Sequence, residues 1–69
     1  MDIKVKFGLR IRELRILRNV SQESLAHSAN IDRTYIQSIE KGKRNVSITT
    51  IEKLAIAFNI PIETLLKNI

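Results

Sequence analysis

The side chains best equipped for chemistry in this 69-residue chain gather between residues 33 and 41, and the chemistry they suit is recognition of DNA bases. An arginine can make a bidentate contact with guanine, a glutamine can do the same with adenine, and a threonine can offer its methyl group to thymine. The candidate base-reading residues are Arg33, Thr34, Gln37 and Ser38. An ordinary solvated helix face is the alternative for the same residues, so their setting has to decide.

These side chains share one side of a helix if residues 33–41 are helical. Each residue of an α-helix advances about 100° around the axis. Ile36 and Ile39 then mark the buried side. The four candidates lie on the far side together with Lys41, and Tyr35 lies at one flank.

The setting that favours base reading is a place as the second helix of a closely packed pair. Residues 21–42, SQESLAHSANIDRTYIQSIEKG, predict two short helices joined by a tight turn, which is the pattern of a helix-turn-helix. Ser21 and Asp32 are expected to cap the two helices, and Asn30 can adopt the positive φ of the turn. Ala26 and Ala29 would let the helices approach closely, although alanine is also simply a good helix former.

The remaining pattern is helical too, with no strand signal that outweighs it. We expect a helix over about Lys4–Arg18, with Asn19 after it, and an end at Gly42 for the second helix of the pair. A further helix should run from its cap at Ser47 to Asn59, followed by a short one with Pro61 in its first turn. The expected inward residues are Phe7, Ile11, Leu14, Leu25, Ala26, Ala29, Ile36, Ile39, Ile51, Leu54, Ala55, Phe58 and Leu65, with Leu17 at the edge. The prediction is an all-α domain of five helices over residues 1–69.

Composition narrows the function classes. A net charge of +5 favours nucleic acid as the partner, with an anionic membrane surface second. No apolar run could span a bilayer, and the start of the chain has no signal-peptide core. The absence of cysteine excludes disulfides and zinc-binding thiolates and suits a reducing cytoplasm, and one histidine, His27, forms no metal cluster. We expect no cofactor, no metal and no small-molecule ligand.

The sequence lacks the residue patterns that an enzyme would need. There is no nucleophile–base pair at motif spacing, no phosphate-binding glycine loop and no set of metal ligands. RNA binding fits the charge, but three aromatic residues, two of them expected in or near the core, provide no stacking platform.

The chain resembles the Cro/repressor-type (XRE-like) helix-turn-helix family. The residues that carry the resemblance are Arg12 and Arg15 in LRIRELR, SQESLA from Ser21, Ile31, Ile36, IEKG from Ile39, and LAIAFNIPIETLL from Leu54. Asn19 and Asn30 stand where glycines are usual, and asparagine tolerates the same backbone. Residues 32–47 look most like the controller proteins of bacterial restriction–modification systems, although related short regulators share much of this segment.

The resemblance implies a role for each matching position. Arg33, Thr34, Gln37 and Ser38 take the base-reading positions. The positions near the DNA backbone are Ser21, Gln22, Tyr35, Lys43, Arg44, Asn45 and Ser47. A solvated basic loop is the alternative for Lys43 and Arg44. The family also places Arg15 and Glu40 in a partly buried ion pair.

Some apolar residues are left over once the core is filled. Ile56, Ile62, Leu66 and Ile69 are candidates for a homodimer interface, which agrees with the region that the family uses. Val5, Leu9 and Ile16 form a second stripe that could contact RNA polymerase or a second dimer, or could be plain surface.

The sequence thus predicts a cytoplasmic, sequence-specific DNA-binding transcriptional regulator that binds a palindromic operator as a homodimer. The rival is an antitoxin-like protein-interaction module in which DNA binding is secondary. A tight complex with another gene's product would favour that rival.

Overall fold

The computed structural model describes residues 1–69, and its first element is α1 (Ile3–Leu17). The carboxylate of Asp2 accepts a hydrogen bond from the Lys4 backbone N–H at 2.8 Å and so caps this helix. The sequence interpretation did not use this cap. It placed the start of the helix at about Lys4, one residue late, and its end at about Arg18, which is the C-cap residue.

Four shorter helices follow: α2 (Gln22–Ala29), α3 (Arg33–Glu40), α4 (Ile48–Phe58) and α5 (Ile62–Leu65). Ser21, Asp32 and Ser47 cap α2, α3 and α4, because each side chain accepts a hydrogen bond from a backbone N–H in the first turn. The expected all-α fold of five helices is confirmed.

The helix ends depend on residues that tolerate a left-handed backbone. Asn30 and Asn59 end α2 and α4 with φ of 55° and 57°. Asn19 has φ of 54°, and Gly42, directly after α3, has φ of 75°. Pro61 had been expected in the first turn of α5, but it is the residue directly before that helix.

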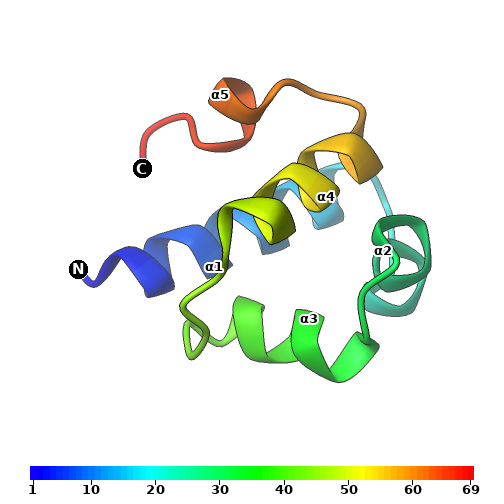
Figure 1. The fold of residues 1–69 in the computed structure, drawn as a ribbon, viewed down its shortest axis with the longest axis horizontal. Helices are drawn as coiled ribbons and strands as arrows, with labels where there is room; N and C mark the ends of the chain where they lie inside the picture. The colour runs from blue at the N-terminus through cyan, green and yellow to red at the C-terminus, as the bar shows by residue number, and fades with distance from the viewer.

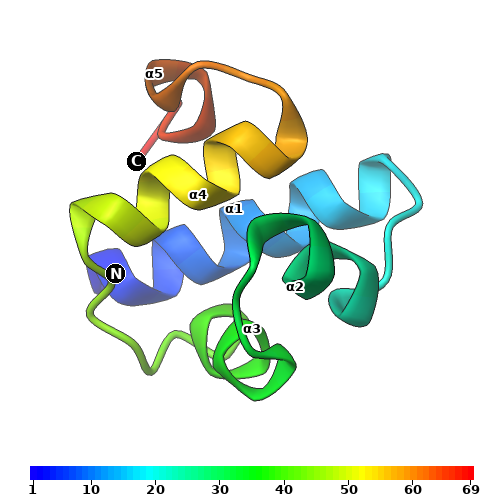
Figure 2. The same ribbon diagram turned by 45° about the vertical axis from the view of Figure 1, so that its right-hand side comes forward.

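The helices stack so that α3 lies at the edge of the molecule. It packs against α1 and α2, while α2 also contacts α4, and α4 holds α5. In both ribbon views α3 and α5 lie at opposite ends of the molecule, with α1 and α4 between them (Figures 1 and 2). The side of α3 that faces away from α1 and α2 is thus left open.

One core joins all five helices. Its members are Phe7, Ile11, Leu14, Leu25, Ala26, Ala29, Ile36, Ile39, Leu54, Ala55, Phe58 and Leu65. Each was expected to point inward. Ile51 was expected in this core too but is only half-buried against it, and Leu17, placed at the edge, is 74% exposed.

The α1–α3 contact depends on a glycine. A Cβ atom at Gly8 would lie 2.2 Å from the backbone oxygen of Ile39, so only glycine allows this approach of the two helices. Gly8 therefore sets how closely α3 sits against α1.

Two arginines of α1 bind the carbonyl ends of other helices. Arg10 donates to the backbone oxygens of Leu65 at 3.0 Å and Thr64 at 2.7 Å. Arg18 donates to the backbone oxygen of Phe58 and lies over its ring. The Leu65 and Phe58 oxygens are carbonyl groups that helix geometry leaves without a partner, whereas the Thr64 oxygen also accepts from the Lys67 backbone N–H. No helix here has the length and apolarity needed to cross a membrane.

Candidate nucleic-acid interface

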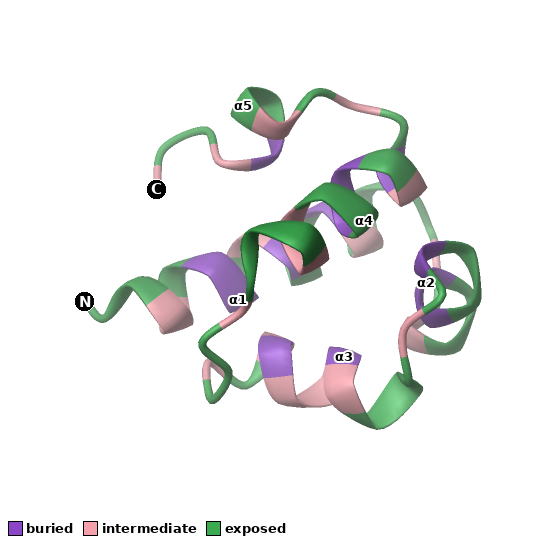
Figure 3. Cartoon of the chain, viewed as in Figure 1, coloured by how far each residue is buried: buried purple, intermediate pink, exposed green.

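The exposed side of α3 is the candidate reading surface. Figure 3 shows buried residues on the side of α3 that faces the rest of the molecule, and half-buried and exposed residues on the other side. Arg33 and Thr34, in the first turn, are exposed, whereas Gln37 and Ser38 are half-buried. The structure thus brings the four candidate base-reading residues to one accessible face.

Close packing of α2 against α3 positions this face. Ala26 and Ala29 of α2 are both buried, at 4% exposure, and α2 packs against both α3 and α4.

Asp32 organises the start of the reading helix. Its carboxylate accepts hydrogen bonds from both the backbone N–H, at 2.8 Å, and the hydroxyl of Thr34. These bonds, with the hydroxyl contributing most, lower the pKa of Asp32 below the ordinary carboxyl value. The Thr34 hydroxyl hydrogen is therefore engaged, so the hydroxyl oxygen as an acceptor and the methyl group are the parts left for a base.

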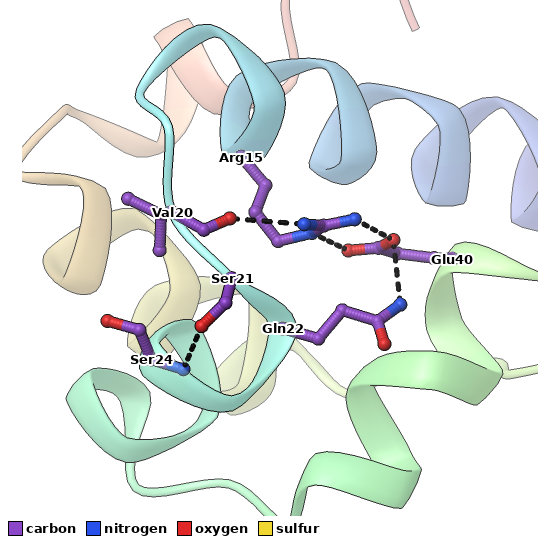
Figure 4. A network of polar contacts seen from close by, with 6 residues as sticks. All are labelled: Arg15, Val20, Ser21, Gln22, Ser24 and Glu40. Carbon is purple, nitrogen blue, oxygen red and sulfur yellow. Dashed lines mark hydrogen bonds and ion pairs between the residues drawn. The ribbon is translucent and has the colours of Figure 1, made fainter.

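A polar network joins α1, α2 and α3 behind the reading surface (Figure 4). Arg15 donates from Nε to Glu40 Oε2 at 2.7 Å and from Nη2 to Oε1 at 3.0 Å. Its Nη1 donates to the backbone oxygen of Val20 at 3.1 Å. The Arg15 and Glu40 side chains are only 14% and 3% exposed, so this is the partly buried ion pair that the resemblance implied.

The same network fixes the start of α2. The side-chain amide of Gln22 donates to Glu40 Oε1 at 3.1 Å (Figure 4), a bond that the sequence did not suggest. The hydrogen bonds to Glu40 are the main reason that the pKa of Arg15 is raised above its ordinary value. Gln22 is thus held at the junction of α2 and α3, next to its expected place at the DNA backbone.

The side chain of Arg44 contacts the reading helix, although the residue is exposed. Its Nε donates to the hydroxyl of Ser38 at 3.2 Å, and its guanidinium lies 5.1 Å from the centre of the Tyr35 ring. Arg44 therefore contacts both Tyr35 and Ser38, to which the resemblance gives separate roles at the DNA.

The other residues expected at the DNA backbone lie along both flanks of α3. Lys43 and Asn45 are exposed in the segment after α3, and their side chains make no hydrogen bond within the chain. The hydroxyls of Ser21 and Ser47 accept from backbone N–H groups at 3.0 Å and 3.1 Å. These hydroxyls cap α2 and α4, and the helix N-termini that they mark favour anions.

A wide polar hollow lies where α2 meets the first turn of α3. Its lining residues, none of them hydrophobic, are Arg15, Ser21, Gln22, Glu23, Ser24, His27 and Arg33. His27, to which the sequence gave no chemical role, is exposed and lines this hollow. The hollow lies between Arg33, a candidate base-reading residue, and Ser21 and Gln22 of α2, which are expected at the DNA backbone.

The leftover apolar residues do not form two simple stripes. Ile56 is 70% exposed, whereas Ile62, Leu66 and Ile69 are half-buried against the core. Leu9 and Ile16 stay exposed, but Val5 is half-buried and adjoins Gly42, where an added Cβ would lie 2.9 Å from its Cγ2. Placing Val5 on the exposed stripe was wrong, because the turn after α3 covers it.

Comparison with known proteins also indicates a helix-turn-helix domain. The family model described as helix-turn-helix matches residues 11–65. The control protein C.MunI of a Mycoplasma species is 44% identical over 69 residues, which cover 99% of this chain and 93% of that protein.

Two solved structures are also similar over most of their length. The restriction–modification controller protein C.AhdI from Aeromonas hydrophila is 48% identical, with a TM-score of 0.87 over 90% of this chain and 94% of that one. C.Esp1396I bound to a 19-base-pair DNA duplex is 28% identical, with a TM-score of 0.89 over 97% and 89% of the two chains.

Proposed function

The chain belongs to the helix-turn-helix family and, within it, to the restriction–modification control proteins, and on this premise we propose that it is a sequence-specific DNA-binding transcriptional regulator of such a system. Its helix α3 reads bases in the major groove, and the residues around it grip the phosphates. The observation that carries this proposal is the open face of α3, which presents Arg33, Thr34, Gln37 and Ser38.

The phosphate grip comes from both flanks of that face. Lys43, Arg44 and Asn45 follow α3 on one side, and the N-terminus of α2, with Ser21 and Gln22, lies on the other. Tyr35 and the start of α4 at Ser47 complete the set. Phosphate contacts supply affinity and salt dependence, whereas α3 supplies the choice of sequence.

We assign the chain a homodimer on a palindromic operator, because two-fold symmetry doubles the contacts. The candidates for its interface are the apolar residues that α4, α5 and the tail leave outside the core: Ile56, Ile62, Leu66 and Ile69. Leu9 and Ile16 on α1 are the surface that RNA polymerase would use if it is a partner. A DNA-bound regulator of this kind would act in the cytoplasm.

Selection from a random pool of DNA duplexes by the purified chain tests the proposal. We expect recovery of a two-fold-symmetric motif. Recovery of no motif, with binding that is lost in moderate salt, would leave only non-specific phosphate affinity. That result would favour the antitoxin-like interaction module, which the similarity to control proteins does not support.

A further inference from the structure

Two hydroxyl groups on the reading face of α3 are engaged in opposite ways by their neighbours. The Thr34 hydroxyl donates its hydrogen to the carboxylate of Asp32. The Ser38 hydroxyl instead accepts from Arg44 Nε at 3.2 Å, so its own hydrogen is free to donate. Because a hydroxyl has one hydrogen and two lone pairs, the two side chains have different hydrogen-bonding capacity left for DNA.

The direction of the Thr34 bond follows from the chemistry of its partner. An ionised carboxylate can only accept, so the shared hydrogen must come from the threonine. Asp32 Oδ1 also accepts from the Thr34 backbone N–H at 2.8 Å, and this cap holds the carboxylate beside the hydroxyl. Both bonds, the one from the hydroxyl first, lower the pKa of Asp32, so this exposed carboxyl is ionised at neutral pH.

A base that offers only acceptors must compete with this carboxylate for the Thr34 hydrogen. Hydrogen bonds to an ionised partner are about twice as strong as those between neutral groups. A neutral base acceptor would therefore replace a stronger bond by a weaker one. A base that offers a donor meets no such competition, because the lone pairs of the hydroxyl oxygen are still available.

We infer that Asp32 determines specificity through Thr34, by making this threonine select a base with an amino group in the major groove. The inference rests on the proposed function. Adenine presents N6 and cytosine presents N4 as donors there, whereas guanine presents only N7 and O6, and thymine only O4, as acceptors. Asp32 is thus a positioning residue, and the hydroxyl oxygen of Thr34 is the group that contacts the base.

Selection from a pool of random duplexes, with the full-length Thr34→Val chain beside the wild type, locates the base that Thr34 reads. Valine keeps a methyl group and lacks only the hydroxyl, so preferences that depend on the hydroxyl should disappear. We expect the wild type to favour adenine or cytosine over guanine at that position by about fivefold or more, the lower end of the cost of one mismatched base pair. Uracil in place of thymine removes the methyl contact from the comparison.

Asp32→Asn tests the positioning role with the helix cap retained, since asparagine also caps helices. Its amide is uncharged and offers a donor as well as an acceptor, so the Thr34 hydroxyl can turn its hydrogen toward a base. We expect the affinity ratio between the adenine and guanine operators to fall about fivefold, to near one. The ratio is the readout because removal of a negative charge near phosphates should strengthen binding to every operator alike.

A double-mutant cycle separates positioning from direct contact. Asp32→Asn introduced into the Thr34→Val chain should not change the ratio further. A further change would mean that Asp32 itself contacts the base, which would overturn the inference. The other operator positions, including any that Ser38→Ala alters, are the internal control, and Asp32→Asn should leave their preferences as in the wild type.

Three other results would overturn the inference. A wild-type preference for guanine or uracil at the position that Thr34→Val alters would show that the hydroxyl donates to the base. An unchanged ratio in Asp32→Asn would show that the carboxylate does not set the direction of the bond. Wild-type preferences at every position in Thr34→Val would show that the hydroxyl reads no base. Each of these differs from a wild-type chain that selects no motif, which would refute the proposed function itself.

Discussion

At the scale of single residues, removal of a base-reading side chain and removal of a phosphate-binding side chain should change DNA binding in different ways. Arg33 is exposed at the start of α3, where a bidentate contact with guanine is available. We expect Arg33→Ala to weaken operator binding by about 1–3 kcal/mol and to relax the preference at one base position. Competition among operators that differ at single positions measures both effects.

Lys43→Ala provides the comparison. It removes a charge that has no partner within the chain, and it should weaken binding to all sequences alike. A loss confined to one sequence would show that Lys43 reads bases, and an unchanged preference in Arg33→Ala would show that Arg33 does not.

Glu40 is expected to matter for stability. It accepts from Arg15 and Gln22 and is nearly buried, so its removal would leave the Arg15 guanidinium without its carboxylate. Breaking a buried pair by removing one partner costs about 3–5 kcal/mol. Glu40→Ala should therefore lower the free energy of unfolding by about that amount, measured by urea denaturation.

Glu63→Ala, which removes an exposed carboxylate from α5, is the control and should change stability little. Unchanged unfolding of Glu40→Ala together with weaker DNA binding would contradict the structural role of the pair.

Asp32 gives a pH dependence whose sign follows from its lowered pKa. A carboxyl with a lower pKa in the folded state than in the unfolded state stabilises the fold at pH values above the unfolded pKa. That contribution is lost as pH falls through the folded pKa. We expect the melting temperature of Asp32→Ala to lie below that of the wild type at pH 7 and the difference to shrink toward pH 3.

Asp32→Asn separates charge from capping, since asparagine also caps helices. The melting difference between the Asn and Ala variants should stay nearly constant with pH. A wild-type advantage that persists unchanged at the lowest pH would contradict the assignment to the ionised carboxylate.

At the scale of elements, the contact of α1 with α3 depends on Gly8. Alanine favours a helix by about 1 kcal/mol over glycine, but its Cβ would meet the backbone oxygen of Ile39, which cannot move aside like a side chain. Gly8→Ala should therefore destabilise the fold by about 1–3 kcal/mol and displace the reading helix. Denaturant unfolding would show the loss, with exposed Lys6→Ala as the control on the same helix. A Gly8→Ala chain as stable as the control would mean that the two helices can separate without cost.

The sequence predicts elements well where the signals are local. Caps at Ser21, Asp32 and Ser47 and the asparagines after α2 and α4 lie within a few residues of the ends that they determine. Apolar spacing likewise predicted the buried residues of every helix. The prediction that Ile51 belongs to the buried core failed, because apolar spacing indicates which side of a helix faces inward and not how deeply a neighbouring element covers each residue.

What the sequence could not give are contacts between distant residues. Arg10 binds the end of α5 about 55 positions away, and the guanidinium of Arg44 lies over the ring of Tyr35. Nothing near either arginine indicates its partner, because the partner is fixed by how the helices pack. The bond from Gln22 to Glu40, 18 positions away, is of the same kind.

At the scale of the whole molecule, the basic residues fall into two groups with different functions. Three arginines of α1, Arg10, Arg15 and Arg18, hold helices together through carbonyl or carboxylate oxygens. The basic residues after α3 are bound less or not at all within the chain. Three of these basic residues, Lys41, Lys43 and Arg44, directly follow α3 beside the reading surface.

This division predicts which charges affect the salt dependence of DNA binding. Each phosphate neutralised steepens the fall of log K with log salt, so Lys43→Ala should reduce the slope by about 1 for each copy bound. Arg10→Ala should leave the slope unchanged, because its guanidinium is committed to Leu65 and Thr64. It should instead lower the free energy of unfolding by about 1.5–3 kcal/mol, the range for hydrogen bonds to charged groups. Titrations of one operator at several salt concentrations, with unfolding curves for the same variants, measure both quantities. A flatter slope for Arg10→Ala with unchanged stability would place Arg10 at the DNA and contradict its role in joining α1 to α5.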